Sequence, residues 1–446
     1  MDRAVLRARR NERRAAGWIA PWVAERRAPV VATLAMFVPV LAYSLLGHSG
    51  LHGGRYELIT PSDLWGLVAS SWALVHGQFA HIYVVPQGTL TSPPALEIAL
   101  APVLLIAQAT GLAAQHSGQP VGLWLLLAPT VLLLASTLLF AIDAVARYWK
   151  LSDGRRLVLA LVSALGVANV TGVWGHPEDC IAVAMVLWSA LALEREGPAA
   201  GPRAALLLGI GVAFQPLAIL AVAPVLARLG WRSVARNSWR LAVPSLVVLV
   251  PALLGEPGRT RFVLVDQPFL PNSVSFTPLT RFAPVIGHGI DGGGPTRLVA
   301  TVLAVVLAVF VCRHRHDLPT VLTMCAVAFF LRVLFETELN WYYLWPVAAV
   351  CLLLAARHNG ARFAMCSVAV VASMVLGNHN TVHHIVLWWP ALMASLVVML
   401  ASASWVPTRQ ALTHGARRHP VGRDEPEKYL IAQGGLRADS RIGPGV

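Results

Sequence analysis

RYELITPSDLWGLVASSWALVHGQFAHIYVVPQGTLTSPP, residues Arg55–Pro94, follows the first apolar run of the chain and begins its helical part with the acid Asp63. After Asp63, apolar residues recur at the spacing of one helix face, which predicts an amphipathic helix over residues 62–79. The residues on this face are Leu64, Leu67, Val68, Trp72, Val75 and Phe79. Such a helix lies along a membrane surface rather than across the bilayer. We therefore expect Asp63 at the boundary between lipid and water, within reach of a lipid headgroup.

The composition indicates a protein that crosses a membrane many times. Of the 446 residues, 56% are hydrophobic and only 13% are charged, and apolar runs of membrane length recur along the whole chain. In lipid such runs must be helices, because an open sheet leaves backbone groups without hydrogen bonds. We expect an all-α polytopic membrane protein with about 11–13 membrane helices.

The formal charge of +13 reflects topology rather than binding to nucleic acid, because the basic residues are concentrated in short loops and near both ends. The loops that this pattern assigns to the cytoplasm are 147–156, 194–203, 228–240, 313–317 and 357–362. Loops rich in acids, histidines and aromatic residues are predicted to be external; they are 174–179, 256–297, 336–343 and 377–384. Both termini are then cytoplasmic.

The chain is expected to have three parts. They are a basic cytoplasmic arm over 1–27, a transmembrane domain over 28–406 and a disordered cytoplasmic tail over 407–446. The external loop 48–120 of the domain carries the interfacial helix. The five cysteines have no paired spacing, which is typical of small buried hydrophobic residues rather than of disulfides or a zinc site.

Two apolar segments do not fit a simple count of crossings. The runs 95–114 and 121–146 cannot both cross if loop 147–156 is cytoplasmic, so we expect the first to lie along or dip into the outer leaflet. The run 204–229 has basic loops at both ends and is interrupted by Gln215-Pro216. A broken pair of short helices that meet near the outer leaflet fits these charges better than one straight span.

Polar residues of the external loops are candidates for chemistry, and each also has a purely structural explanation. Asp63 could close a capping box in which Thr60 is the N-cap and Pro61 the first helical residue. This role is compatible with catalysis, because a cap also fixes the direction of the carboxylate. His176, Glu178 and Asp179 in WGHPED could start a helix, or bind a divalent cation or a polar substrate.

Arg332 lies near the outer end of an apolar run, with Glu336 one turn further on. An arginine in the membrane is costly, so it is either paired within its helix or placed to receive a phosphate. Other cations of the long external loop that could receive a phosphate are Arg259, Arg261, Arg281 and His288.

Aromatic and histidine residues complete the set of candidates. Glu338, Asn340 and Tyr342 belong to an aromatic stretch that suits either the membrane interface or a sugar ring. A loose external group of histidines could be solvated, titrate together or bind a metal; its members are His379, His383 and His384.

The order of these features resembles a known family. Asp63 before an amphipathic helix, then Gly77, Tyr83 and the Pro93-Pro94 pair, is similar to the C superfamily (GT-C) of integral membrane glycosyltransferases. The closest likeness is to the bacterial polyprenyl-phosphate-mannose-dependent mannosyltransferases that build envelope lipoglycans. GHPED and the later GIGVAFQPLAILAVAPVL also resemble that group, and the likeness covers roughly Pro29–Leu229. This chain differs in having Gln215 where the family usually has Lys, and one acid, with Glu57 nearby, where it has an adjacent acidic pair.

The resemblance implies transfer of a sugar, on the outer face of the cell membrane, from a polyprenyl-phosphate donor to a glycan or glycolipid acceptor. Asp63 would be the general base, and the leaving phosphate would face Arg332, Arg261 or Arg281. The residues implied to bind substrate are Tyr83, His176, Glu178, Asp179, Gln215, Arg332, Glu336, Glu338, Asn340 and Tyr342. No cofactor is certain, and a divalent cation would be compatible with these side chains.

Two other functions remain open. The chain could be a secondary transporter or flippase of a lipid-linked or polar solute, or a catalytically silent GT-C-like partner in an assembly. A transporter should carry charged residues near the middle of several spans. Here the acids and histidines are concentrated at one predicted face, which favours chemistry outside the membrane.

Overall fold

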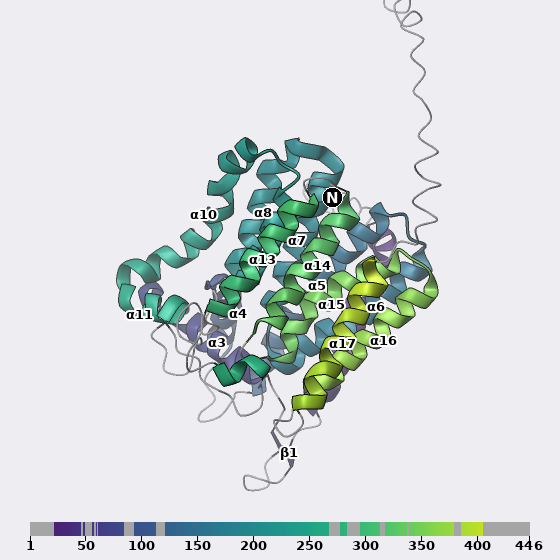
Figure 1. Ribbon diagram of the computed structural model, residues 1–446. Coiled ribbons are helices and arrows are strands. Elements are labelled where there is room, and N and C mark those ends of the chain that lie inside the picture. The colour runs from purple at the N-terminus through teal and green to yellow at the C-terminus, as the bar shows by residue number, and fades with distance from the viewer. Residues whose placement is uncertain are drawn as a thin grey trace, which may run out of the picture. The chain divides into compact units, whose positions relative to one another are not determined.

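The described part of the protein is built almost entirely from helices (Figure 1). The computed structural model describes residues 22–45, 48–49, 56–57, 59, 61–83, 93–112, 121–266, 277–282, 295–312, 317–336, 339–378 and 385–404. The strands among them are a two-residue pair, β1 (His48–Ser49) and β2 (Tyr56–Glu57), which is antiparallel with His48 opposite Glu57. The prediction of an all-α polytopic membrane protein is confirmed.

The helices of the first half begin at the first apolar run. They are α2 (Arg27–Leu45), α3 (Ser62–Val75), η1 (Phe79–His81), α4 (Ala95–Ala109), α5 (Val121–Tyr148), α6 (Asp153–Asn169), η2 (Val170–Trp174), α7 (Pro177–Glu196), η3 (Gly197–Ala200), α8 (Gly201–Phe214), η4 (Pro216–Ala221) and α9 (Val222–Leu226). The second half contains α10 (Trp231–Gly255), α11 (Pro257–Arg261), η5 (Phe262–Asp266), η6 (Pro278–Phe282), α13 (Pro295–Cys312), α14 (Leu318–Leu334), η7 (Trp341–Leu344), α15 (Trp345–Ala356), α16 (Gly360–Asn378) and α17 (Ile385–Ser404).

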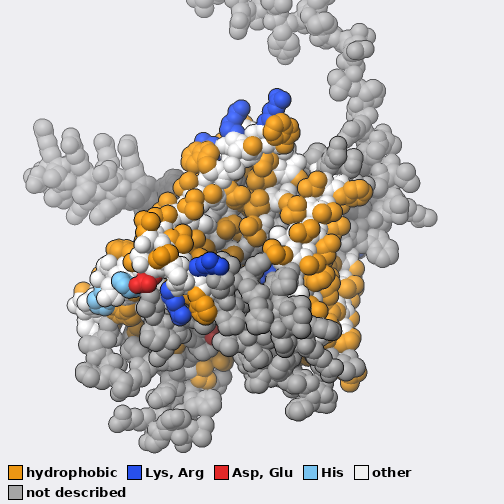
Figure 2. All heavy atoms as spheres, turned by 60° about the vertical axis from the view of Figure 1, so that its left-hand side comes forward, with side chains coloured by type: hydrophobic (Ala, Val, Ile, Leu, Met, Phe, Trp, Pro, Cys, Tyr) orange, Lys and Arg blue, Asp and Glu red, His pale blue; other side chains and the backbone are white. Residues whose placement is uncertain are grey.

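Seven described helical segments are long and apolar enough to cross a membrane. They are Arg27–Leu45, Leu123–Tyr148, Asp153–Trp174, Pro177–Phe214, Trp231–Gly255, Gly360–Gly377 and Leu387–Ser404. Six further apolar helices have 10–17 residues, so a count of about 11–13 depends on these shorter helices. Figure 2 shows hydrophobic side chains over the helices, between an upper edge with Lys and Arg and a lower region with acidic, basic and histidine side chains. This apolar surface is suited to contact with acyl chains.

The packing separates two ends of the helix bundle. At the basic end, Arg156 pairs with Asp143 at 2.8 Å and Arg228 pairs with Glu194 at 2.6 Å. The 22-residue segment from Asp153 to Trp174 leads away from this end over about 33 Å, at 1.5 Å per residue. Its far end meets the starts of α3 and α7, and the polar residues described below are concentrated there.

The break expected at Gln215-Pro216 is confirmed. α8 ends at Phe214, Gln215 is extended with φ −151° and ψ 119°, and η4 begins at Pro216. Proline disfavours the helical conformation of the residue before it and has no N–H to donate, so the helix cannot continue through this point. α4 has only 15 residues, fewer than the ~20 that a span needs.

One prediction for the first external loop is wrong. The helix ends at Val75 and not at 79, because a turn with Gly77 at φ +73° follows it. The capping box considered for Asp63 includes Thr60, which lies outside the described residues; the N-cap of α3 is Pro61, which makes no side-chain cap hydrogen bond. The apolar stripe is also covered by protein: Leu64 and Leu67 are buried, and α3 packs against α4 and η2.

Candidate functional site

Asp63, His176 and Glu178 form a line of contacts where α3 and α7 begin. His176 Nε2 lies 3.0 Å from Asp63 Oδ2, and His176 Nδ1 lies 2.6 Å from Glu178 Oε1. The exposed fraction of the side chain falls from 41% in Asp63 to 16% in His176 and 4% in Glu178. The line therefore runs from the protein surface to its interior.

The local sequence explains how these groups meet. Gly175 has φ +84°, and a Cβ at this position would lie 2.7 Å from the backbone nitrogen of Leu64. Only glycine allows both this conformation and this close approach of the α3 start. Pro177 then occupies the first turn of α7, which places Glu178 and Asp179 at the positive end of the helix.

The neighbouring carboxylates favour the protonated, charged form of His176. Burial alone would lower the pKa of His176, but the charge of Glu178 and the hydrogen bonds with Asp63 and Glu178 raise it to about 10. An imidazolium donates from both nitrogens, which matches a carboxylate on each side of the ring. His176 is therefore a cation at neutral pH.

An aromatic group connects His176 to Arg332. The Tyr342 ring stacks on His176 with centroids 3.9 Å apart, and Tyr343 meets Tyr342 edge-on at 4.6 Å. The Arg332 guanidinium lies 4.5 Å from the centre of the Tyr343 ring. Asn340 Nδ2 donates to the Tyr342 hydroxyl at 3.3 Å. Residues from η7 and α14 thereby join the line that starts at Asp63.

Glu336 joins two arginines from different helices. Its Oε1 accepts from Arg297 Nε at 2.8 Å, and its Oε2 lies 3.3 Å from Arg332 Nε. The Glu336 side chain is 1% exposed, so both ion pairs are shielded from water. Of the two alternatives considered for Arg332, the ion pair with Glu336 is present, and the second partner of Glu336 is Arg297 at the start of α13.

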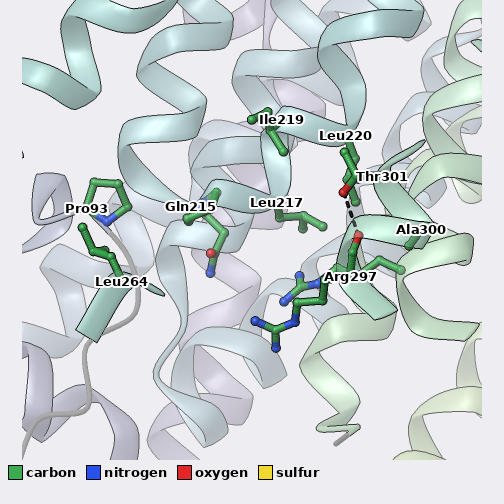
Figure 3. Close-up of a pocket in the computed structure, with 11 residues that line it drawn as sticks. Pro93, Gln215, Leu217, Ile219, Leu220, Leu264, Arg297, Ala300 and Thr301 are labelled. Carbon is green, nitrogen blue, oxygen red and sulfur yellow. Dashed lines mark hydrogen bonds between the residues drawn. The ribbon is translucent and has the colours of Figure 1, made fainter. Parts of the chain in front are cut away.

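The two arginines line a cavity of about 280 Å³. Its other lining residues are mainly apolar; they are Pro93, Gln215, Pro216, Leu217, Ile219, Leu220, Leu264, Ala300 and Thr301. In Figure 3 the side chains of Gln215 and Arg297 both lie below Ile219. Ile219 is half-exposed on the apolar surface of the protein. The cavity thus combines a cationic part with a wall that continues towards lipid.

Gln215 links this cavity to the histidine group. The Gln215 side chain hydrogen-bonds Asp179, which follows Glu178 in the first turn of α7 and also interacts electrostatically with Arg332. Asp63 and His176 do not line the cavity themselves. The cavity and the line of Asp63, His176 and Glu178 are therefore adjacent. The first turn of α7 joins them on one side, and Tyr342 and Tyr343 join them on the other.

The structure unites residues that the sequence assigned to three external loops and two apolar runs. The predicted residues that it brings together are Asp63, His176, Glu178, Asp179, Gln215, Arg332, Glu336, Asn340 and Tyr342. Tyr83 is buried but does not line the cavity, and its carbonyl oxygen accepts from Arg259 Nε at 3.0 Å. Arg261 is exposed on α11 and does not line the cavity.

Several predicted residues lie outside the described part of the chain. They are Glu338, His288, His379, His383, His384 and the side chain of Arg281. Among the described residues no group of three or more His, Cys, Asp and Glu side chains is arranged to hold a metal ion.

Sequence reasoning did not single out two residues of the site. Arg297 stands in the first turn of an apolar run, and Glu97 is a buried acid in the apolar helix α4 that interacts electrostatically with Glu178. The signal was present for both, because a lone charge in an apolar run is a functional candidate, as it was for Arg332.

Comparison with known proteins adds no relative, since neither a family model nor a curated protein matches this chain.

Proposed function

We propose that this protein is a membrane glycosyltransferase of the GT-C kind, which moves a sugar from a polyprenyl-phosphate donor to the hydroxyl of an envelope glycan or glycolipid. The observation that carries the proposal is the cavity in which Arg297 and Arg332 meet an apolar wall. A lipid phosphate needs both features, a cationic place for its headgroup and an apolar path for its chain.

The charge of the cavity fits a phosphate. Glu336 contacts two guanidinium groups but carries only one negative charge. Asp179, which is hydrogen-bonded to Gln215, also interacts electrostatically with Arg332. Arginine presents several donors in a rigid plane, which matches the oxygens of a phosphate. Preorganised cations stabilise the negative charge that grows on a leaving phosphate in the transition state. In this proposal Arg297 and Arg332 do this work together.

Asp63 is suited to be the general base. It is the most exposed member of its line, and His176 fixes the direction of its carboxylate at 3.0 Å. In the proposed reaction the acceptor oxygen bonds to the anomeric carbon of the donor sugar while the bond from that carbon to the phosphate oxygen breaks. The acceptor proton goes to Asp63, and the bonding electron pair leaves with the polyprenyl phosphate.

The distribution of charge supports an external site. The loops around Arg156 and Arg228 gather at the basic end, and loops rich in Lys and Arg are retained in the cytoplasm. The site at the other end then faces the non-cytoplasmic side.

The test is transfer of labelled sugar from a polyprenyl-phosphate mannose to a lipoglycan acceptor by the purified protein in lipid vesicles. We expect Asp63→Asn to lower kcat by about 10²–10⁴-fold, with little change in the KM for the donor. Arg297→Gln should raise the donor KM and lower kcat. Arg203→Gln is the matched control, because Arg203 is an exposed arginine paired with Glu196 at the basic end. Unchanged transfer by Asp63→Asn would refute the assignment of the base.

The break at Gln215 gives specific support to a second function, a transporter or flippase. Transporter sites are often built where a membrane helix is interrupted, because the freed backbone groups and helix ends face the solute. Movement of a fluorescent lipid phosphate across the vesicle bilayer, without formation of a glycosylated product, would favour this alternative over transfer.

A further inference from the structure

The contacts of His176 point to a role beyond substrate binding. Both of its ring nitrogens face carboxylates, Asp63 on the surface side and Glu178 on the interior side, at 3.0 and 2.6 Å. The ring plane is fixed from another direction by Tyr342, whose ring is inclined by only 22° to it. The two hydrogen bonds and the stacked Tyr342 ring together fix the orientation of the His176 ring. Asp63 therefore contacts a donor that cannot turn away from it.

The acid at the inner end of the line is itself in an unusual place. Glu178 has one oxygen on His176, while its second oxygen is buried without a hydrogen-bond partner among the described residues. Glu97 lies near enough to interact with it, and burial together with the charge of Glu178 raises the pKa of Glu97 to about 8, so a further negative charge is unfavourable at this place. Several buried carboxylates at one place repel one another, and a fixed positive charge reduces this repulsion.

We propose that His176 and Glu178 are positioning residues for Asp63: Glu178 keeps His176 charged, and the charged His176 keeps Asp63 ionised and aimed at the acceptor hydroxyl. This inference rests on the proposed function, in which Asp63 is the base. In this inference His176 and Glu178 do not contact the sugar. They act through Asp63, and they determine kcat and the pH range in which the reaction proceeds.

The charged groups around His176 determine the direction of each effect. Asp63 faces it from α3, Glu178 and Asp179 from α7, and Tyr342 from η7. Behind them, Glu97 of α4 acts on Glu178, and Arg332 of α14 acts on Asp179. The imidazolium is therefore surrounded mainly by acids, and its removal leaves Asp63 near carboxylates that favour its protonated form.

The two positioning residues should move opposite limbs of the pH–rate profile. His176→Gln removes the cation that favours ionised Asp63, so the acid limb of the profile should shift to higher pH. We also expect kcat to fall about tenfold or more and the KM for the donor to stay unchanged. In Glu178→Gln, His176 loses its proton at a lower pH, because the charge of Glu178 no longer stabilises the imidazolium. The alkaline limb of the profile should therefore shift to lower pH. Glu178→Asp keeps the charge and should restore most of the alkaline limb. A structural role would lower kcat at every pH alike.

The decisive experiment combines these profiles with a readout that needs no activity. Nitrogen-15 NMR of histidine-labelled protein in nanodiscs, assigned with His176→Gln, reports whether the ring carries two protons. We expect a charged His176 at pH 8 in the wild type and a neutral one in Glu178→Gln. Asp153→Asn is the control, since Asp153 is exposed at the basic end.

The outcomes separate this inference from the proposed function. A neutral His176 at pH 8 in the wild type would overturn the positioning role whether or not the protein transfers sugar. Sugar transfer with both limbs unmoved in the two variants would also overturn it and leave the glycosyltransferase proposal standing. A charged His176 that becomes neutral in Glu178→Gln, in a protein that transfers no sugar from any lipid phosphate, would refute the proposed function and support the charged clamp.

Discussion

Replacing Glu336 with glutamine will leave Arg297 and Arg332 without the carboxylate that joins α13 to α14. The carboxylate contacts Arg297 at 2.7 and 2.8 Å and Arg332 at 3.3 Å, and its side chain is 1% exposed. Glutamine keeps the size of the side chain, so the perturbation is one of charge and not of packing. The two guanidinium groups then repel each other where little water can screen them.

The magnitude follows from the burial. Removing one partner of a buried ion pair costs about 3–5 kcal/mol, because the remaining charge is left uncompensated. The glutamine oxygen still accepts one hydrogen bond, so we expect a loss of about 3 kcal/mol. An anion in the adjacent cavity can replace the lost charge, and an anion at 100 times its Kd adds about 2.7 kcal/mol. Phosphate should therefore restore nearly the whole loss.

The assay is thermal unfolding of purified protein in detergent, with phosphate or chloride at equal ionic strength. Glu336→Gln should unfold at lower temperature in chloride and recover in phosphate. Asp143→Asn is the matched control, because Asp143 is also 1% exposed and its partner Arg156 is at the opposite end of the bundle. The unfolding temperature of Asp143→Asn should fall by the same amount in phosphate as in chloride. Equal stabilisation of both variants by phosphate, or no loss in Glu336→Gln, would refute the reasoning.

Three further predictions use other parts of the structure. The pKa of His176 is about 10 in the folded protein against 6.5 ordinarily, so the protonated ring stabilises the fold fully below pH 6.5 and this stabilisation is lost as the pH rises to about 10. The stability difference between wild type and His176→Gln should shrink over this range by on the order of 4 kcal/mol, and a difference constant with pH would contradict it. Gly209→Ala should cost about 1–3 kcal/mol, because its Cβ would lie 2.5 Å from the Leu241 carbonyl oxygen of α10. Gly154→Ala, with nothing within 4 Å, should lower the unfolding temperature little or not at all. Since the described cysteines are all buried, a cysteine at Gly154 should react only from inside intact cells and one at the exposed Gln78 only from outside, and the reverse pattern would invert the proposed topology.

The sequence predicted the features that depend on local chemistry. The long apolar runs required helices, and the first long apolar helix, Arg27–Leu45, begins within one residue of the predicted start of the transmembrane domain at residue 28. Pro216 interrupts its helix because a proline cannot donate a backbone hydrogen bond, whatever surrounds it. The Glu336 partner of Arg332 was one of two alternatives that the sequence offered, because residues four apart in a helix lie close together.

Tertiary structure decided which distant groups meet. Asp63 looked like a capping residue of its own helix, but its carboxylate lies on His176, 113 positions away, because Gly175 allows the two helix starts to approach. Arg297 reaches Glu336 only through the packing of α13 on α14. Periodicity and composition describe a segment's own backbone and its apolar face. The partner of a buried charge depends instead on how the helices pack around it, and no local pattern encodes that choice.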